Sequence, residues 1–384
     1  MNRHVVKSIT LVMVLVALLC SFIFAGCATP TSTPEPTEKP ASATPEPVET
    51  TASTEAPKPV ADPVVIDILH TNDVHARAIE GKYDGMGYAK LATLVERFRA
   101  ANPNTLLIDA GDTFHGKTLA TLEEGESIVE IMNLIGYDYM APGNHDFNYG
   151  ADKLFELAGM AEFPIISANV VRDGDLFLPA YEITEIEGVK IGLFGLTSEE
   201  TAYKTHPDNV ADITFTNSIE AAQKMVDKLS GEVDIIICIG HIGTDASTLI
   251  TSEMICDAVS GIDLFIDGHS HTELDGGIVS QTGTVIVSAG EYLQNLGHVR
   301  LTYADGMVSI EAELIERVLP NGDVEDLIDG IADAQAEILG EVVGSTDVTL
   351  DGERDDVRTG ETNLGNLIVD AMIYETGADI ALTN

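Results

Sequence analysis

Apolar residues recur in two alternating patterns from residue 64 onward. Short runs rich in β-branched residues are typical of buried strands, whereas apolar residues three or four positions apart are typical of helices that cover a sheet. The expected strands are 64–69, 104–108, 137–140, 164–168, 190–196, 234–239, 263–266 and 284–288. The expected helices are 90–100, 127–134, 153–158, 219–229 and 324–339. This alternation predicts a layered α/β domain over residues 64–319, followed by a connecting helix over residues 320–339.

Residues 340–384 have the pattern of a new unit. They are about 45 residues long, which is shorter than most chains that fold alone, and they stop in the strand-like segment 380–384. We therefore expect residues 340–384 to be the beginning of a second α/β domain that continues beyond this sequence.

The first 63 residues have a different composition from the rest. A basic start followed by the almost wholly apolar segment 9–24 predicts a signal peptide over residues 1–27. The small residues before Cys27 resemble the cleavage box of bacterial lipoproteins, which predicts a lipid on Cys27; an ordinary secretory signal is the alternative. Residues 28–63, rich in Thr, Pro and Glu, predict an extended stalk. The expected location is the outer face of a bacterial membrane, with the folded part outside the cytoplasm.

Composition and charge restrict the class of partner. Hydrophobic residues make up 45% of the chain, enough for a large buried core. The formal net charge of −43 argues against a nucleic-acid polymer as a partner, because such binding requires a basic surface that releases counterions. A small anionic substrate is still compatible with this charge if bound cations receive it.

Five short motifs containing Asp, Asn and His follow strand-like segments. They are Asp73-Val-His75, Gly111-Asp112, Gly143-Asn144-His145-Asp146, Gly240-His241 and Gly268-His269-Ser-His271. Ligands of α/β sheets bind at the carboxyl ends of strands, so these motifs are expected to lie together. Their carboxylate, amide and imidazole groups are ligands for divalent cations, and a carboxylate can bridge two of them. Two such ions would acidify a shared water molecule and clamp an in-line phosphoryl displacement, which predicts phosphoester hydrolysis.

In this order, the motifs resemble those of the calcineurin-like metallophosphoesterases. Segments similar to the bacterial 5′-nucleotidase branch are Leu69-His-Thr-Asn-Asp-Val-His75, Gly143-Asn-His-Asp-Phe-Asn-Tyr-Gly150 and Glu361-Thr-Asn-Leu-Gly-Asn-Leu-Ile368. The likeness covers about residues 64–384 and implies a four-layer αββα catalytic domain followed by a domain that supplies the nucleoside pocket. It also implies that Asp73, His75, Asp112 and His271 hold one divalent ion, and that Asp112, Asn144, His241 and His269 hold the other. The ions would be zinc, manganese or iron.

The resemblance also implies residues that contact the substrate. His145 would lie near the phosphate, beside Asn144, and stabilise charge in the transition state. The 5′-nucleotidases commonly place an aspartate where this chain has Asn148, and an amide does not favour the imidazolium as a carboxylate does. His145 is therefore expected to be less basic than in that aspartate–histidine pair. Arg358 and Asn384 fall at positions where the family contacts the nucleotide.

Other polar residues near the motifs are interpreted as structural. His70 and His298 lie within strand-like runs and match no ligand position. Asp109 is expected to orient the Asp112 loop. His115 could line the mouth of the substrate site, but an exposed loop histidine is the expectation.

The predicted function is hydrolysis of nucleotides by a 5′-nucleotidase-like phosphomonoesterase, with UDP-sugars as further substrates. Asn148 leaves open a 2′,3′-cyclic nucleotide 2′-phosphodiesterase with 3′-nucleotidase action. A protein of another class, a surface-binding lipoprotein that kept the fold but lost the chemistry, would explain the stalk and the lipidation motif. Such a protein would have no physical reason to retain all seven metal ligands.

Overall fold

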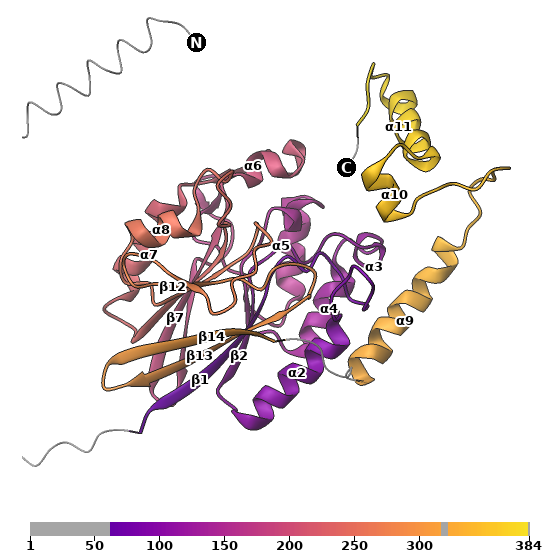
Figure 1. The fold of residues 1–384 in the computed structure, drawn as a ribbon. Helices are drawn as coiled ribbons and strands as arrows, with labels where there is room; N and C mark the ends of the chain where they lie inside the picture. Colours follow the sequence, from indigo (N-terminus) through magenta and orange to yellow (C-terminus); the bar gives the residue numbers. More distant parts are fainter. Residues whose placement is uncertain (1–61, 316–321, 383–384) are drawn as a thin grey trace, which may run out of the picture. The chain divides into compact units, whose positions relative to one another are not determined.

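Two β-sheets that pack face to face form the centre of the protein (Figure 1). The structure is a computed structural model and describes residues 62–315 and 322–382. The first sheet has the strand order β14-β13-β1-β2-β3, with β1 (Val64–Thr71), β2 (Thr105–Asp109), β3 (Tyr139–Met140), β13 (Leu296–Ala304) and β14 (Met307–Ile315). The second has the order β11-β12-β10-β9-β7-β6, with β6 (Tyr181–Ile186), β7 (Val189–Thr197), β9 (Ile235–His241), β10 (Leu264–Asp267), β11 (Ile278–Val279) and β12 (Val285–Val287). A small third sheet contains β4 (Val170–Arg172), β5 (Asp175–Leu176) and β8 (Ile213–Phe215).

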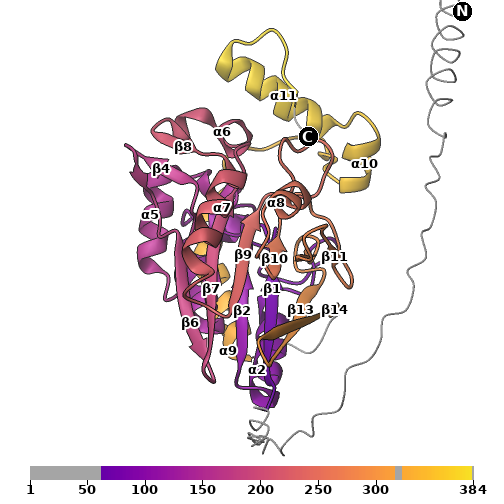
Figure 2. The same cartoon turned by 90° about the vertical axis from the view of Figure 1, so that its left-hand side faces the viewer.

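Helices cover the outer face of each large sheet (Figures 1 and 2). The first sheet is covered mainly by α2 (Tyr88–Ala101), α4 (Glu126–Ile135) and α5 (Ala151–Met160). The second sheet is covered by α7 (Ser218–Leu229) and α8 (Ser252–Ala258). Shorter helical segments are α3 (Thr118–Thr121), η1 (His145–Phe147), α6 (Thr201–Lys204) and η2 (Pro207–Val210).

The period-two pattern of the strands divides the buried residues into three layers. In β9, Ile235, Ile237 and Ile239 face the core between the sheets, whereas Ile236 and Cys238 face α7 and α8. The third apolar layer lies between the first sheet and its own helices. Three apolar interfaces separate four layers of secondary structure, so the predicted αββα architecture is confirmed.

Two parts of the first sheet differ from the sequence prediction. Residues 164–168 were predicted as a strand, but the structure has only an isolated bridge between Met140 and Ile165. The hairpin of β13 and β14 was not predicted, although β13 pairs with β1 along most of its length. Partly exposed and exposed residues alternate in β14, so this strand lacks the continuous apolar run by which buried strands are recognised.

After the sheets, α9 (Gly322–Leu339) packs on the helices of the first layer. Val324, Ile328 and Ile331 join their apolar core, as the helical spacing predicted. By contrast, α10 (Arg354–Thr359) and α11 (Asn363–Thr376) bury none of their residues. In the described ranges, no helix combines enough length and apolar character to cross a bilayer.

Several sequence predictions fall outside the described residues. These are the signal peptide with Cys27, nearly all of the stalk, part of the connection before α9, and Asn384. They stay predictions, as do the proposed domain boundaries.

A buried carboxylate connects β1 to β13 and to the end of α2. Asp67 accepts hydrogen bonds from Arg300 (3.0 Å) and Asn102 (2.9 Å), and its Oδ1 lies 2.8 Å from Nε2 of His298. Burial raises the pKa of Asp67, but the hydrogen bonds from Arg300, His298 and Asn102 outweigh it and hold the pKa below its ordinary value. His298 is thus part of a structural cluster, in agreement with its interpretation from sequence.

We expect the ionised Asp67 to stabilise the fold above about pH 4. Its pKa in the folded state lies below its unfolded value, so this contribution is lost as the pH falls through the folded-state pKa. Urea denaturation should therefore show that the difference in unfolding free energy between wild type and Asp67→Asn shrinks as the pH falls below about 4. A difference that stays constant with pH would contradict this assignment.

Candidate metal centre and active site

The predicted ligands lie where strands of both large sheets end. The loop after β1 carries Asp73 and His75, and the loops after β2 and β3 carry Asp112 and Asn144. His241 is the last residue of β9, and His269 and His271 follow β10. Two sheets that are distant in sequence thus bring their carboxyl ends to one place.

The first group of ligand atoms contains Asp73, His75 and His271. Nε2 of His271 lies 3.4 Å from Oδ1 of Asp73 and 3.4 Å from Nε2 of His75. One ligand atom from each residue lies within 4.8 Å of the others. This spacing can hold a single cation.

The second group contains Asp112, His241 and His269, whose ligand atoms also lie within 4.8 Å of one another. Nε2 of His241 lies 3.2 Å from Oδ2 of Asp112. The same carboxylate oxygen lies 3.9 Å from Nε2 of His75, which belongs to the first group. Asp112 therefore stands between the two groups, as a bridging carboxylate would.

Buried polar atoms without hydrogen-bond partners show that the residues fit cations. Among the described residues, Oδ1 of Asn144 and Nε2 of His241 are buried and have no hydrogen-bond partner. An unpaired buried polar atom is costly, and a cation at the second group would satisfy both atoms. His241 donates its Nδ1–H to the backbone oxygen of Ala110, 2.7 Å away, so its Nε2 is the atom available to a cation.

The charges of the cluster lead to the same conclusion. Burial lowers the pKa of His241, but the carboxylates of Asp112 and Asp73 outweigh it and raise the pKa to about 10. Without a cation, a proton on His241 compensates these buried carboxylates. Burial lowers the pKa of His75 and that of His269 to about 4, so both rings are neutral at pH 7 and have a lone pair for a metal ion.

The backbone of the ligand loops is strained. Five ligand residues have left-handed φ angles, namely Asp73 (52°), His75 (50°), Asp112 (58°), His269 (79°) and His271 (54°). Residues other than glycine rarely adopt this conformation, and it concentrates at functional sites. Glycine is required beside them, because a Cβ at Gly143 would lie 2.2 Å from Oδ1 of Asp112.

Asp146, the last residue of the Gly-Asn-His-Asp motif, connects two of these loops. Its Oδ1 accepts from the backbone N–H groups of Thr113 (2.9 Å) and Phe114 (2.8 Å). Its Oδ2 accepts from those of Asp112 (2.9 Å) and Gly143 (2.8 Å). The side chain is fully buried, so one carboxylate determines the relative position of the Asp112 and Asn144 loops.

Two glutamates that the sequence analysis missed hold the histidines after β10. Nδ1 of His271 lies 2.5 Å from Oε2 of Glu291, which leaves Nε2 for a cation. Nε2 of His269 lies 3.3 Å from Oε2 of Glu200, which leaves Nδ1. Such outer carboxylates orient a metal-binding imidazole and increase its basicity. Neither glutamate belongs to one of the five motifs, and both are distant from their histidine in sequence, so no spacing pattern could have revealed them.

We expect Glu291→Gln to weaken divalent-metal binding by about 10- to 100-fold, because the carboxylate no longer orients His271. Titration of the metal-free chain with Zn²⁺ in the presence of a competing chromophoric chelator would measure this. The matched control is Glu273→Gln. Glu273 lines the same surface cavity as Glu291, but its carboxylate accepts a hydrogen bond from Asn295 and, within the part of the chain that the structure describes, does not contact a predicted metal ligand. Equal losses in the two variants would contradict the assignment.

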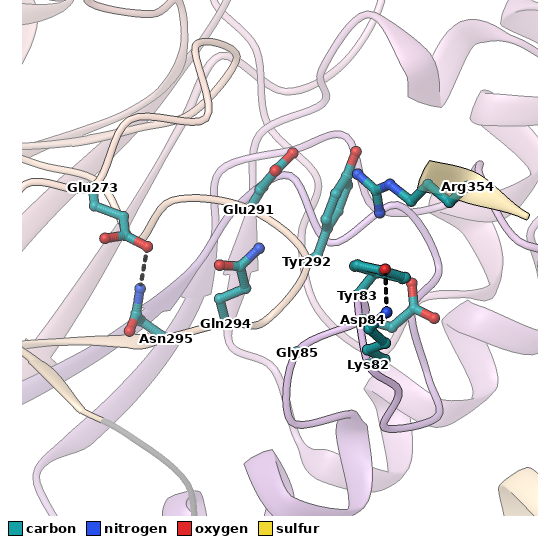
Figure 3. A pocket seen from close by; sticks show the side chains of 10 residues that line it. All are labelled: Lys82, Tyr83, Asp84, Gly85, Glu273, Glu291, Tyr292, Gln294, Asn295 and Arg354. Carbon is teal, nitrogen blue, oxygen red and sulfur yellow. Dashed lines mark hydrogen bonds between the residues drawn. The ribbon is translucent and has the colours of Figure 1, made fainter. Parts of the chain in front are cut away.

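A cavity of about 580 Å³ lies beside the metal centre (Figure 3). Its lining includes Tyr83, Glu291, Tyr292 and, from α10, Arg354. The centre of the Tyr292 ring lies 5.7 Å from that of His75, and the Arg77 guanidinium lies 3.3 Å from the Tyr292 ring centre. The cavity is large enough for a drug-sized organic group next to the predicted ligands.

His145 and Asn148 lie at the edge of this centre. A ring nitrogen of His145 lies within 4.8 Å of ligand atoms of His75 and Asp112. Nδ2 of Asn148 lies 2.9 Å from Nδ1 of His145 and 3.1 Å from Nδ1 of His115. The expectation that His115 is an exposed loop histidine is wrong. Its ring is partly buried and stacks on that of His145, because the loop after Asp112 is bonded to the loop of His75, with the N–H of Ala76 donating to the backbone oxygen of Thr113.

Arg358 is not brought to this centre. It is exposed on α10, and no contact with a predicted metal ligand is present among the described residues. Arg354, four positions earlier, is the α10 residue that lines the cavity.

The layered fold and a carboxylate-centred set of Asp, Asn and His ligands define a metal-dependent phosphoesterase, which is a hydrolase. Residues 66–273 match the calcineurin-like phosphoesterase family, and residues 342–384 match the C-terminal domain of 5′-nucleotidases. The chain belongs to the calcineurin-like phosphoesterase family, as the motif order predicted.

Individual relatives agree with this assignment. The trifunctional nucleotide phosphoesterase protein YfkN of Bacillus subtilis is 33% identical over 83% of this chain, which spans 24% of YfkN. The 5′-nucleotidase of Bos taurus is 32% identical over 82% of this chain, which spans 61% of that protein. The crystal structure of the 5′-nucleotidase precursor from Thermus thermophilus has a TM-score of 0.67 and 26% identity, covering 82% of this chain and 67% of that one. The chain therefore spans less than two thirds of the length of the curated relatives named here.

Proposed function

We propose that this protein hydrolyses nucleotide phosphomonoesters, as a 5′-nucleotidase does, with two divalent cations. The position of the Asp112 carboxylate between two groups of ligand atoms is the observation that carries this proposal. Asp73, His75, Asp112 and His271 would hold one cation, and Asp112, Asn144, His241 and His269 the other. When bound, the cations would lower the pKa of water and neutralise charge on the phosphate oxygens. Zinc, manganese and iron all suit this ligand set.

The chain's own residues would bind and orient the ester. His145 is close enough to the centre to donate a hydrogen bond to a phosphate oxygen, where negative charge increases in the transition state. The Asp146 carboxylate holds the Asp112 loop and the Asn144 loop together, so little reorganisation of these loops would be needed during the reaction. The neighbouring cavity can receive an organic leaving group. We also propose a contact between Arg358 and the nucleotide, and UDP-sugars as further substrates.

A 2′,3′-cyclic nucleotide phosphodiesterase with 3′-nucleotidase action is the second candidate. Asn148, at hydrogen-bonding distance from His145, favours it, because an amide does not stabilise the imidazolium as a carboxylate does. For location, we propose that a lipid at Cys27 holds the catalytic domain outside the cytoplasm.

Turnover of AMP, UDP-glucose, 2′,3′-cyclic AMP and an aryl phosphate, with and without a chelator, tests the proposal. Because the relatives are longer, the assay should compare this chain with a version extended to the full C-terminal domain. We expect chelator-sensitive turnover that favours AMP, whereas a preference for the cyclic substrate would select the second candidate. Turnover that persists in the presence of the chelator would refute the metal mechanism. If the chain is inactive and elemental analysis finds fewer than two metal ions per chain, a surface-binding protein that has lost the chemistry would be favoured.

A further inference from the structure

The side chain of Asn148 lies between two imidazole rings and contacts both. Its Nδ2 is 2.9 Å from Nδ1 of His145 and 3.1 Å from Nδ1 of His115. Its Oδ1 accepts a hydrogen bond from Oγ1 of Thr205 at 2.9 Å, and its backbone oxygen accepts one from Asn209 at 2.7 Å. These contacts fix the amide with its NH₂ group toward the two rings.

An amide NH₂ group has two hydrogens, one for each ring. A ring nitrogen that accepts a hydrogen bond is unprotonated, so a neutral imidazole in this arrangement carries its hydrogen on Nε2. Among the described residues, no hydrogen bond is made to Nε2 of either His115 or His145. Both rings therefore have an Nε2–H group available to a ligand.

The two rings are held as a pair. Their planes differ by 12° and their centres are 5.9 Å apart. Burial and the neighbouring His145 lower the pKa of His115 below its ordinary value, so its neutral form is favoured.

The backbone holds His115 beside the metal ligands. Thr113 and Phe114, the residues before it, donate their N–H groups to Asp146. At Gly116, the residue after it, φ is 152° and a Cβ would lie 2.2 Å from the backbone oxygen of His75. The loop therefore presents His115 in a fixed position, as a site that binds substrate without reorganisation requires.

We propose that His115 is a further phosphate-contacting residue, and that Asn148 holds His115 and His145 as paired Nε2–H donors for the oxygens of the bound phosphoryl group. This inference rests on the proposed function, because a phosphoester must bind at the metal centre. In this arrangement Asn148 positions the two imidazole rings and does not itself contact the phosphate. An aspartate at position 148 can only accept, so it would reverse both hydrogen bonds and require a hydrogen on Nδ1 of each ring.

The arrangement of the ring hydrogens is tested first, without metal or phosphate. In the full chain labelled with ¹⁵N-histidine, long-range NMR correlations should show both Nδ1 atoms unprotonated and both Nε2 atoms protonated. Asn148→Asp should place a hydrogen on Nδ1 of both rings. Protonated Nδ1 atoms in the wild type would overturn the inference, whatever the activity of the chain.

The phosphate contact is tested with inorganic phosphate as the probe and the metal-loaded chain. His115→Phe keeps a stacked ring but removes the donor, and we expect it to weaken phosphate binding in calorimetry by about tenfold. His206→Phe, which removes an exposed histidine, is the control.

The outcomes separate this inference from the proposed function. Unchanged phosphate affinity in His115→Phe, with normal metal content, would overturn the contact and leave the two-metal hydrolase intact. Failure of the wild type to bind phosphate would also overturn the contact. Only the chelator assay decides whether the protein is a metal-dependent hydrolase.

Discussion

Asp112→Asn is expected to reduce phosphoester turnover by about three orders of magnitude, because in the proposed mechanism this carboxylate would bridge two cations that supply several kcal/mol. Oδ2 of Asp112 lies 3.2 Å from Nε2 of His241 and 3.9 Å from Nε2 of His75. An amide at this position has only one weak oxygen ligand and cannot bridge two ions. Elemental analysis after dialysis should therefore find that most of the bound metal is lost as well.

The asparagine is chosen so that the loop keeps its shape. Asp112 has a φ of 58°, a conformation that asparagine tolerates better than most residues. The control is Asp173→Asn, an exposed position with a φ of 54°, which should retain both metal and turnover. Two tightly bound ions per chain in the Asp112→Asn variant would refute the bridging role.

Asp146→Asn is expected to lower the free energy of unfolding by about 3 kcal/mol and to disrupt the metal centre. Both carboxylate oxygens of Asp146 accept two backbone N–H groups each, all within 2.9 Å. In asparagine, an NH₂ group replaces one of these oxygens and faces two N–H donors. Two buried donors would lose their acceptor, and the loops of Asp112 and Asn144 would separate.

Urea denaturation at constant pH, with a chelator present in all samples, would measure the stability change without a contribution from bound metal. Asp263→Asn is the matched control, because Asp263 accepts one backbone N–H group, that of Ile236. We expect the control to lose much less stability and to retain metal binding. If the Asp146 variant is as stable as the control, Asp146 does not connect the two loops in the way described.

Asp146 illustrates how much of the site could be predicted from the sequence. Its motif was recognised, but the predicted roles were those of Asn144, as a metal ligand, and His145, near the phosphate. Asp146 connects the two loops through its hydrogen bonds with residues 112–114, which are more than 30 positions away in the sequence. Sequence proximity could not reveal that one carboxylate binds four N–H groups.

The sequence by itself determined the layered α/β class, the seven candidate ligands and the family. Alternation of apolar and polar positions is a local property, and each ligand motif directly follows a strand, so both can be recognised from neighbouring residues. The order of the five motifs then identified the family without any knowledge of distances.

Only the tertiary structure decided which residues orient those ligands. Glu200 and Glu291 reach their histidines from other loops, and His115 meets Asn148 across 33 positions. The β13–β14 hairpin also placed β1 inside its sheet, although its alternating pattern gave a weak local signal. Hydrogen bonds and charge interactions depend on distance in space, and folding brings these distant residues to within 3.3 Å of each other. These partners therefore become known only when the chain is folded.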